Sequence, residues 1–262
     1  MQIDIYQIDA FASRPFEGNP AAVCPLDAWL PDELMQSIAA ENNLSETAFF
    51  VPDGANYHIR WFTPAAEVEL CGHATLASAF VLFNCLGVAG DTVTFDSQSG
   101  LLPVHRDGDR IVLDFPAQPP EACDTPPEVV EAFGANPVEC LQSADLVVVF
   151  EHADQVRSAD PDIGVLARLE SRGIIITAAA EEYDFISRFF APAVGIPEDP
   201  VTGSAHTQLV PYWSGKTGKS RFRARQVSAR GGDLTCELIG DRVHIGGTAV
   251  KYLQGSIDVC RD

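Results

Sequence analysis

The sequence has no long apolar run and few basic residues. No stretch approaches the roughly 20 consecutive apolar residues that a membrane-spanning helix needs. Residues 1–11 alternate polar and apolar side chains, without the basic start and apolar core of a secretory signal. We therefore predict a cytoplasmic protein that does not contact a membrane.

Basic residues are scarce, with 17 Lys and Arg against 37 Asp and Glu, a net charge of −20. Such a charge repels the phosphates of nucleic acids, and no basic stripe offsets the repulsion. We predict no nucleic-acid partner. A small anionic substrate remains compatible, because backbone N–H groups at a helix N-terminus can outweigh distant surface charge.

Paired cysteines are also lacking. The seven cysteines are scattered, their number is odd, and no C-x-x-C pair occurs, which argues against a disulfide framework or a structural zinc site. Cys71 and His73 are neighbours, but no third and fourth ligand follows at a suitable spacing. The sequence therefore predicts no metal.

What the sequence does contain is a folded α+β pattern. Apolar residues make up 46% of the 262 residues, enough for two modest lobes. A strand is expected near 3–11, a helix from Pro31 to Asn42, and strands at 47–51 and 58–63. Glu46 stands at the start of the strand at 47–51. The segment 72–83 has a helical pattern that is apolar nearly all round, so this helix must be buried.

The second half of the chain repeats the first. Phe62-Thr63-Pro64-Ala65, an acidic loop and Gly72 are echoed by Phe190-Ala191-Pro192-Ala193, an acidic loop and Gly203. Gly108-Asp109-Arg110 is echoed by Gly240-Asp241-Arg242 at nearly the same offset, which indicates a duplication. The run 116–127 holds five prolines and is interpreted as a linker. We place the lobes at 1–117 and 118–262, with a C-terminal strand able to pack on the N-terminal lobe.

Small residues at Gly72 and Gly203 begin the two repeated helices. The unpaired N–H groups of a first helical turn bind carboxylates well. We expect the two helix starts to face each other and to hold a small carboxylate-bearing substrate.

Five segments together resemble the PhzF family of phenazine biosynthesis proteins, and they occur in the expected order along nearly the whole chain. They are Gly18-Asn19-Pro20-Ala21-Ala22-Val23, Asn43-Leu44-Ser45-Glu46-Thr47, Cys71-Gly72-His73-Ala74-Thr75, Asp199-Pro200-Val201-Thr202-Gly203-Ser204-Ala205 and Ser228-Ala229-Arg230-Gly231-Gly232. The resemblance implies a diaminopimelate-epimerase-like fold. In that fold two pseudo-symmetric lobes each curl a mostly antiparallel, barrel-like sheet around a buried helix.

The resemblance also implies an isomerase that needs neither metal nor pyridoxal phosphate and is often a homodimer. The characterised member moves a proton between ring carbons of a dihydro-hydroxyanthranilate. By resemblance, the acid/base glutamate is Glu46, and the other catalytic residues are His73, Asp199 and Ser204. Substrate binding falls on Asn19, Cys71, Gly72, Thr202 and Gly203. Burial beside Ala48 and Phe49 is expected to make Glu46 a stronger base than an exposed glutamate.

Two alternatives stay open. The protein could be a binding member of the same fold without turnover, since a fold does not dictate a function. It could also use cysteine bases, as diaminopimelate epimerases do at positions that match Cys71 and Thr202. Because Thr202 cannot form a thiolate, the sequence disfavours a two-cysteine mechanism.

Overall fold

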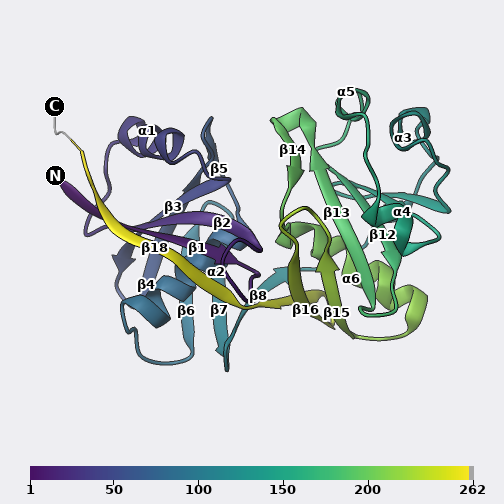
Figure 1. Ribbon diagram of the computed structural model, residues 1–262. Helices are drawn as coiled ribbons and strands as arrows, with labels where there is room; N and C mark the ends of the chain where they lie inside the picture. Colours follow the sequence, from purple (N-terminus) through teal and green to yellow (C-terminus); the bar gives the residue numbers. More distant parts are fainter. Residues whose placement is uncertain (260–262) are drawn as a thin grey trace. The chain divides into compact units, whose positions relative to one another are not determined.

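The chain divides into two compact units in the computed structural model, which describes residues 1–259 (Figure 1). Unit 1 comprises Met1–Asp114 together with the C-terminal segment from Gly246, and unit 2 comprises Phe115–Ile245. The fold is α+β, with many strands and few helices. None of the helices in the described residues is long and apolar enough to cross a membrane.

Strands of unit 1 pair mostly antiparallel; the pairs β2–β3 and β4–β6 are parallel. The first strand pairs with the last over its whole length, so the two ends of the chain share one sheet. The strands are β1 (Gln2–Ala10), β2 (Asn19–Pro25), β3 (Glu46–Asp53), β4 (Asn56–Phe62), β5 (Glu67–Val68), β6 (Thr92–Ser97), β7 (Gly100–Asp107), β8 (Arg110–Pro116) and β18 (Ala249–Asp258).

The central helix of unit 1 is α2 (Gly72–Phe80), which lies among strands β1, β2 and β3 (Figure 1). Every residue from His73 to Ala79 is buried, which confirms the prediction made from its apolar pattern. The helix continues as the π-helical turn η1 (Val81–Cys85), where the sequence predicted a regular helix to residue 83. Val81, Leu82 and Phe83 of this turn are buried.

The other helix of unit 1 is α1 (Asp32–Asn42), which packs on β3 and β4. Its buried residues Met35, Ile38 and Ala39 are spaced for one helical face, and they join a core cluster with Phe49 and Phe62. The helix ends at Asn43, whose left-handed φ of 49° breaks the helical path.

Unit 2 has its own core, built from apolar residues of β11, β12 and β13 and of the helices beside them. Its strands are β9 (Glu121–Ala122), β10 (Glu139–Gln142), β11 (Leu146–Val149), β12 (Ile174–Ala179), β13 (Phe185–Ala191), β14 (Ile196–Asp199), β15 (Arg221–Gln226), β16 (Gly232–Ile239) and β17 (Arg242–Gly247). Its helices are α3 (Pro127–Phe133), α4 (Ala153–Arg157), α5 (Ile163–Leu166), η2 (Pro192–Val194) and α6 (Gly203–Thr217). The run 116–127, interpreted as a linker, contains the short strand β9, where Ala122 pairs with Leu141.

Corresponding elements recur in the two units in the order that the sequence repeat indicated. In unit 1 a long strand, β4, is followed by a short strand, β5, and then by α2. In unit 2, β13 is followed by η2, the short strand β14 and then α6. Both helices begin at a glycine, and the residues before them, Cys71 and Thr202, have extended backbones. The repeat therefore delivers an equivalent helix start in each unit.

Candidate active site

Glu46 is the first residue of β3, at the point where this buried strand begins. Its register is fixed because β3 pairs in parallel with β2, with Glu46 opposite Ala21. The residues that follow it along β3, from Thr47 to Val51, are all buried, and only 9% of Glu46 itself is exposed. The strand thus holds a carboxylate at the edge of an apolar core.

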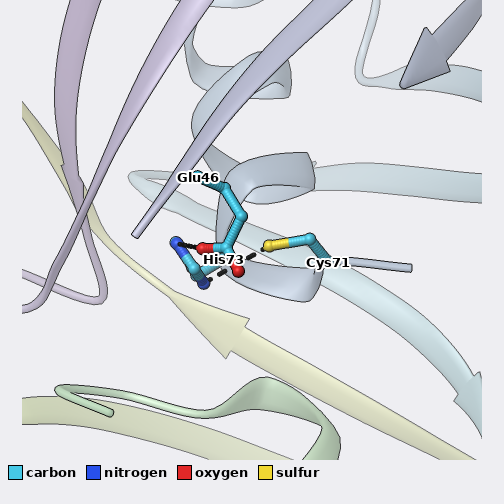
Figure 2. Close-up of side chains that lie close together, drawn as sticks. All are labelled: Glu46, Cys71 and His73. Carbon is cyan, nitrogen blue, oxygen red and sulfur yellow. Dashed lines mark hydrogen bonds and ion pairs between the residues drawn. The ribbon is translucent and has the colours of Figure 1, made fainter. Parts of the chain in front are cut away.

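Cys71 and His73 bring the first turn of α2 to this carboxylate, so that the three side chains gather in one place (Figure 2). His73 Nε2 lies 3.0 Å from Glu46 Oε2, and Cys71 Sγ lies 3.5 Å from His73 Nδ1. The contact between Nε2 and Oε2 is close, but neither atom has a hydrogen-bond partner of good geometry among the described residues. Buried polar atoms in this state are the ones that a bound substrate could satisfy.

Asn19 fixes the other edge of the His73 ring. Ser45 Oγ donates to Asn19 Oδ1 at 3.1 Å, which directs the amide nitrogen of Asn19 toward His73 Nδ1 at 3.3 Å. An amide nitrogen only donates, so this contact fits the neutral ring, in which Nδ1 accepts and Nε2–H faces Glu46; a charged ring has a proton on both nitrogens, with Nε2–H still facing Glu46. Gly18 allows the backbone path that places Asn19, because its φ is +67° and a Cβ there would lie 2.1 Å from the Ala10 carbonyl oxygen.

Burial and neighbouring charge set the protonation of the α2 pair. Burial, with the Glu46 carboxylate beside it, raises the pKa of Cys71 to about 11, so Cys71 is a thiol at neutral pH. Burial alone would lower the pKa of His73, but the Cys71 sulfur and the Glu46 carboxylate outweigh it, and the pKa is raised well above its ordinary value. Because Cys71 keeps its proton, the carboxylate is the partner that favours the charged imidazole.

In unit 2, Asp199 and Thr202 meet at the start of α6. Thr202 Oγ1 donates to Asp199 Oδ2, and both residues are nine-tenths buried. The fully buried Gln226 joins them: its Oε1 accepts from the Thr202 N–H at 2.9 Å and its Nε2 donates to the Asp199 carbonyl at 2.7 Å. Ser228 donates to the Pro200 carbonyl at 2.7 Å, so the segment that follows β15 braces the loop before α6.

Ser204, on the first turn of α6, contacts Arg172 and is not part of the Asp199–Thr202 pair. Arg172 Nη2 is 3.4 Å from Ser204 Oγ, while its guanidinium binds the fully buried carboxylate of Asp145 at 2.6 and 2.8 Å. Gln208 Nε2 donates to the same carboxylate at 2.7 Å. Sequence reasoning missed Asp145, Arg172, Gln208 and Gln226, since none lies in a recognisable motif and each has its partner 24 to 63 residues away along the chain.

The predicted site residues therefore form one group in each unit. Asn19, Glu46, Cys71, Gly72 and His73 come together in unit 1. The second group, Asp199, Thr202, Gly203 and Ser204, stands at the start of α6. His206 is fully buried one turn further along α6, and its Nδ1 contacts the Thr202 carbonyl at 2.9 Å.

The fold is epimerase-like. A solved hydroxyproline epimerase from Agrobacterium vitis, with bound trans-4-hydroxy-L-proline, superposes with a TM-score of 0.65 over 98% of this chain and 92% of its own. At 9% identity the likeness concerns the fold alone.

The chain belongs to the PhzC–PhzF family of phenazine biosynthesis-like proteins, whose sequence profile matches residues 8–255. A relative in Pseudomonas aeruginosa, named an uncharacterized isomerase, is 55% identical over 98% of this chain and 99% of its own length. A solved PhzF-family protein from Enterococcus faecalis is 48% identical, with a TM-score of 0.97 over 99% of this chain and all of its own. The resemblance seen in the five sequence segments is confirmed.

Proposed function

We propose that this protein is a metal- and cofactor-independent isomerase that moves a proton between carbon atoms of a small carboxylate-bearing substrate, with Glu46 as the general acid/base. The observation that supports the proposal most directly is the Glu46 carboxylate itself. It is nine-tenths buried, and its Oε2 lacks a hydrogen-bond partner among the described residues while lying 3.0 Å from a histidine nitrogen. The names of its relatives, uncharacterized isomerases, point to the same class of reaction.

The proposed reaction begins when Glu46 takes a proton from a substrate carbon and becomes a carboxylic acid. The electron pair left on carbon is delocalised toward the substrate carboxylate or a conjugated double bond, and the developing negative charge needs donors nearby. His73 Nε2–H supplies one donor, and the N–H groups of the first turn of α2, which begins at Gly72, supply others. Glu46 then returns the proton to a second carbon on the same face, so atoms and charge balance without an external reactant.

Cys71 has a positioning role in this proposal. A thiol whose pKa is about 11 is a poor base at neutral pH, so Cys71 does not compete with Glu46 for the substrate proton. Its sulfur instead borders His73 Nδ1 at 3.5 Å and limits how the ring can turn. In the unit 2 group, Asp199 and Ser204 are proposed to share in proton handling and substrate fixing, and Thr202 and Gly203 in binding.

Hydrogen exchange at carbon tests the proposal. The protein is incubated in deuterated water with a panel of small unsaturated or amino-substituted carboxylates that includes a dihydro-hydroxyanthranilate, and label at carbon is followed by NMR. Loss of a positioned general base costs about 10²- to 10⁴-fold in rate, so Glu46→Gln should exchange label slower by that factor. Glu41→Gln, a change at an exposed glutamate of α1, is the matched control and should exchange like wild type.

A Glu46→Gln protein that exchanges as fast as wild type would remove Glu46 from the mechanism. If Cys71→Ser alone abolished exchange, the cysteine-based alternative would replace the glutamate-based one. A panel member that binds without exchange in wild type, and no longer binds after changes at Glu46 and Asp199, would indicate a non-catalytic binding protein of the same fold.

We also propose that the two units are copies of one ancestral lobe, each a curled sheet around its central helix, and that the protein is a homodimer. The repeated order of elements around α2 and α6 supports the first proposal. The second rests on family resemblance. Light scattering on the purified 28.2 kDa chain tests it, and a monomer at micromolar concentration would contradict it.

A further inference from the structure

We infer that Glu46, Cys71 and His73 form a binding site for one divalent cation of the zinc class, which inhibits the protein by occupying its acid/base group. The inhibition rests on the proposed function, whereas the binding does not. Sequence spacing alone showed only Cys71 and His73, and predicted no metal. The structure supplies a third ligand type from β3, far away in the sequence.

The three side chains have the mutual distances of ligands around one ion. A carboxylate oxygen, a sulfur and a ring nitrogen all lie within 4.8 Å of one another. Cys71 Sγ and His73 Nδ1 are 3.5 Å apart. Two ligands at about 2.0 Å (nitrogen) and 2.3 Å (sulfur) from a tetrahedral Zn²⁺ are separated by roughly the same 3.5 Å. The pair is therefore already spaced for coordination.

The donor set selects the kind of cation. Thiolate and imidazole ligands favour Zn²⁺ and related borderline-soft ions, whereas Mg²⁺ and Ca²⁺ prefer sites made of oxygen. Because Cys71 is a thiol at neutral pH, the ion displaces its proton, and any proton on His73 Nδ1, to solvent as it binds, so binding should tighten as the pH rises. Three protein ligands leave a fourth position for water. The ion would take Nδ1, the nitrogen that faces the sulfur, and would displace the amide hydrogen bond from Asn19. It would also hold the Glu46 carboxylate as a ligand, so Glu46 could no longer accept a proton from carbon.

Cobalt is the spectroscopic probe for this site. The metal-free full-length protein, prepared with a chelator that is then removed, is titrated with Co²⁺. The expected result is one Co²⁺ per chain, a sulfur-to-cobalt charge-transfer band, the intense ligand-field bands of tetrahedral cobalt, and displacement of Co²⁺ by Zn²⁺. Cys71→Ser should remove the charge-transfer band. Cys123→Ser, a change at an exposed cysteine outside the site, should keep it.

Measuring Zn²⁺ affinity in several variants tests the site even if one of them does not fold. Outer-shell changes at metal sites cost about 10- to 100-fold in affinity, so loss of a direct ligand in Glu46→Gln or His73→Gln should weaken Zn²⁺ binding about 100-fold or more. Circular dichroism checks that each variant is folded. Absence of a thiolate band in wild type, its persistence in Cys71→Ser, its loss in Cys123→Ser, or unchanged Zn²⁺ affinity in folded Glu46→Gln and His73→Gln would each overturn the site.

Inhibition is read separately from binding. Metal-free wild type should exchange hydrogen at carbon, and Zn²⁺ should stop the exchange at the concentrations that displace Co²⁺. Exchange that continues with the site filled would refute inhibition. A protein that binds Zn²⁺ but never exchanges label would contradict the proposed function and leave the cation site intact.

Discussion

At the residue scale, the Glu46 carboxylate is the main charge that favours the protonated form of His73, because Cys71 keeps its proton. Both side chains are buried, and a buried charge is costly unless an opposite charge lies close by. The carboxylate 3.0 Å from Nε2 is such a partner, and it helps to raise the pKa of His73 against the opposing effect of burial. Removing the charge at position 46 should therefore reverse the shift.

We expect the pKa of His73 to fall in Glu46→Gln, because burial then acts without a carboxylate to oppose it. The measurement is an NMR titration of the histidine side chains in wild type and variant. Glu41→Gln, which removes an exposed charge, should leave the His73 titration in place. An unchanged His73 pKa in folded Glu46→Gln would mean that the carboxylate does not control this ring.

His206 is the opposite case, a buried histidine without a charged partner. Burial lowers its pKa to about 4, although the Thr202 carbonyl beside Nδ1 favours the charged form. An unfolded histidine titrates near 6.5, so between these two values the unfolded chain binds the proton and the folded chain does not. The stabilising effect is therefore fully present above about pH 6.5 and lost as the pH falls toward 4.

Proton linkage gives the expected change in the free energy of unfolding. Going from pH 7 to pH 5 should cost wild type roughly 2 kcal/mol of unfolding free energy through His206 alone. Urea unfolding at the two pH values should show that His206→Gln loses about that much less, whereas His105→Gln, a change at an exposed histidine, behaves like wild type. Equal losses in wild type and His206→Gln would show that this ring is protonated in the folded state.

The sequence could predict site residues that lie in local motifs, but not the contacts that depend on tertiary structure. Glu46, Cys71 and His73 were each recognised, because family motifs carry them. That Glu46 completes a three-ligand cluster could not be predicted, since the cluster depends on the register of β3 against β2 and on the start of α2. Gln226 shows the same limit in unit 2: it reaches Thr202 and Asp199 from a strand that follows α6.

At the scale of elements, the turn between β1 and β2 positions Asn19. Gly18 has a φ of +67° and no room for a Cβ beside Ala10. Gly54, in the turn between β3 and β4, has a similar φ of +60° but nothing within 4 Å of the Cβ position. The two glycines differ in packing and not in backbone conformation, which makes them a matched pair.

Gly54→Ala should cost about 1 to 2 kcal/mol of unfolding free energy, the penalty of a left-handed alanine. Gly18→Ala should cost roughly 1 to 3 kcal/mol more, because the new methyl group meets backbone that cannot yield. It should also slow hydrogen exchange at carbon, since Asn19 no longer orients His73. Chemical denaturation measures the first effect and the NMR exchange assay the second. Equal stability losses in the two variants would contradict the packing argument.

Gln226 joins β15 to the start of α6, and replacing it with leucine should show what the link contributes. Gln226→Leu leaves the buried Thr202 N–H without this acceptor, which costs about 1 to 3 kcal/mol, and it also removes the hydrogen bond to the Asp199 carbonyl, worth roughly 1 kcal/mol. We therefore expect a loss of at least about 2 kcal/mol in urea unfolding. Gln254→Leu, a change at an exposed glutamine, is the control and should change stability by less than about 0.5 kcal/mol. An unchanged free energy of unfolding in Gln226→Leu would show that Gln226 does not stabilise the start of α6.

Elements with strong local patterns could be predicted, and elements that depend on tertiary packing could not. The all-apolar pattern of 72–83 predicted a buried helix, and α2 is one. The π-helical turn at Val81–Cys85 could not be predicted, because its apolar residues Val81, Leu82 and Phe83 fit a regular buried helix equally well. The short strand β9 was missed for a similar reason, since a run of prolines hides a pairing that only β10 reveals.

At the scale of the whole molecule, one unit is formed by a single continuous segment of the chain and the other by two segments. Unit 2 is one continuous segment with its own apolar cluster around β11, β12 and β13. Unit 1 combines residues 1–114 with the segment after Gly246, because β18 pairs with β1 from Gln2 to Ala10. Glu46, Cys71 and His73 therefore lie in a unit that needs both ends of the chain.

This difference predicts how fragments behave. Residues 115–245, expressed alone, should fold and unfold cooperatively in urea, because they retain a complete core. Residues 1–114 alone should not, since β1 keeps β2 as a neighbour but loses its pairing with β18 along nine residues, and the strand edge left unpaired there favours aggregation. Joining 246–262 to 1–114 through a Gly/Ser linker should restore cooperative unfolding, and with it the cobalt band of the Glu46–Cys71–His73 cluster. A folded 1–114 fragment, or a linked fragment that stays unfolded, would show that pairing between β1 and β18 does not decide the stability of unit 1.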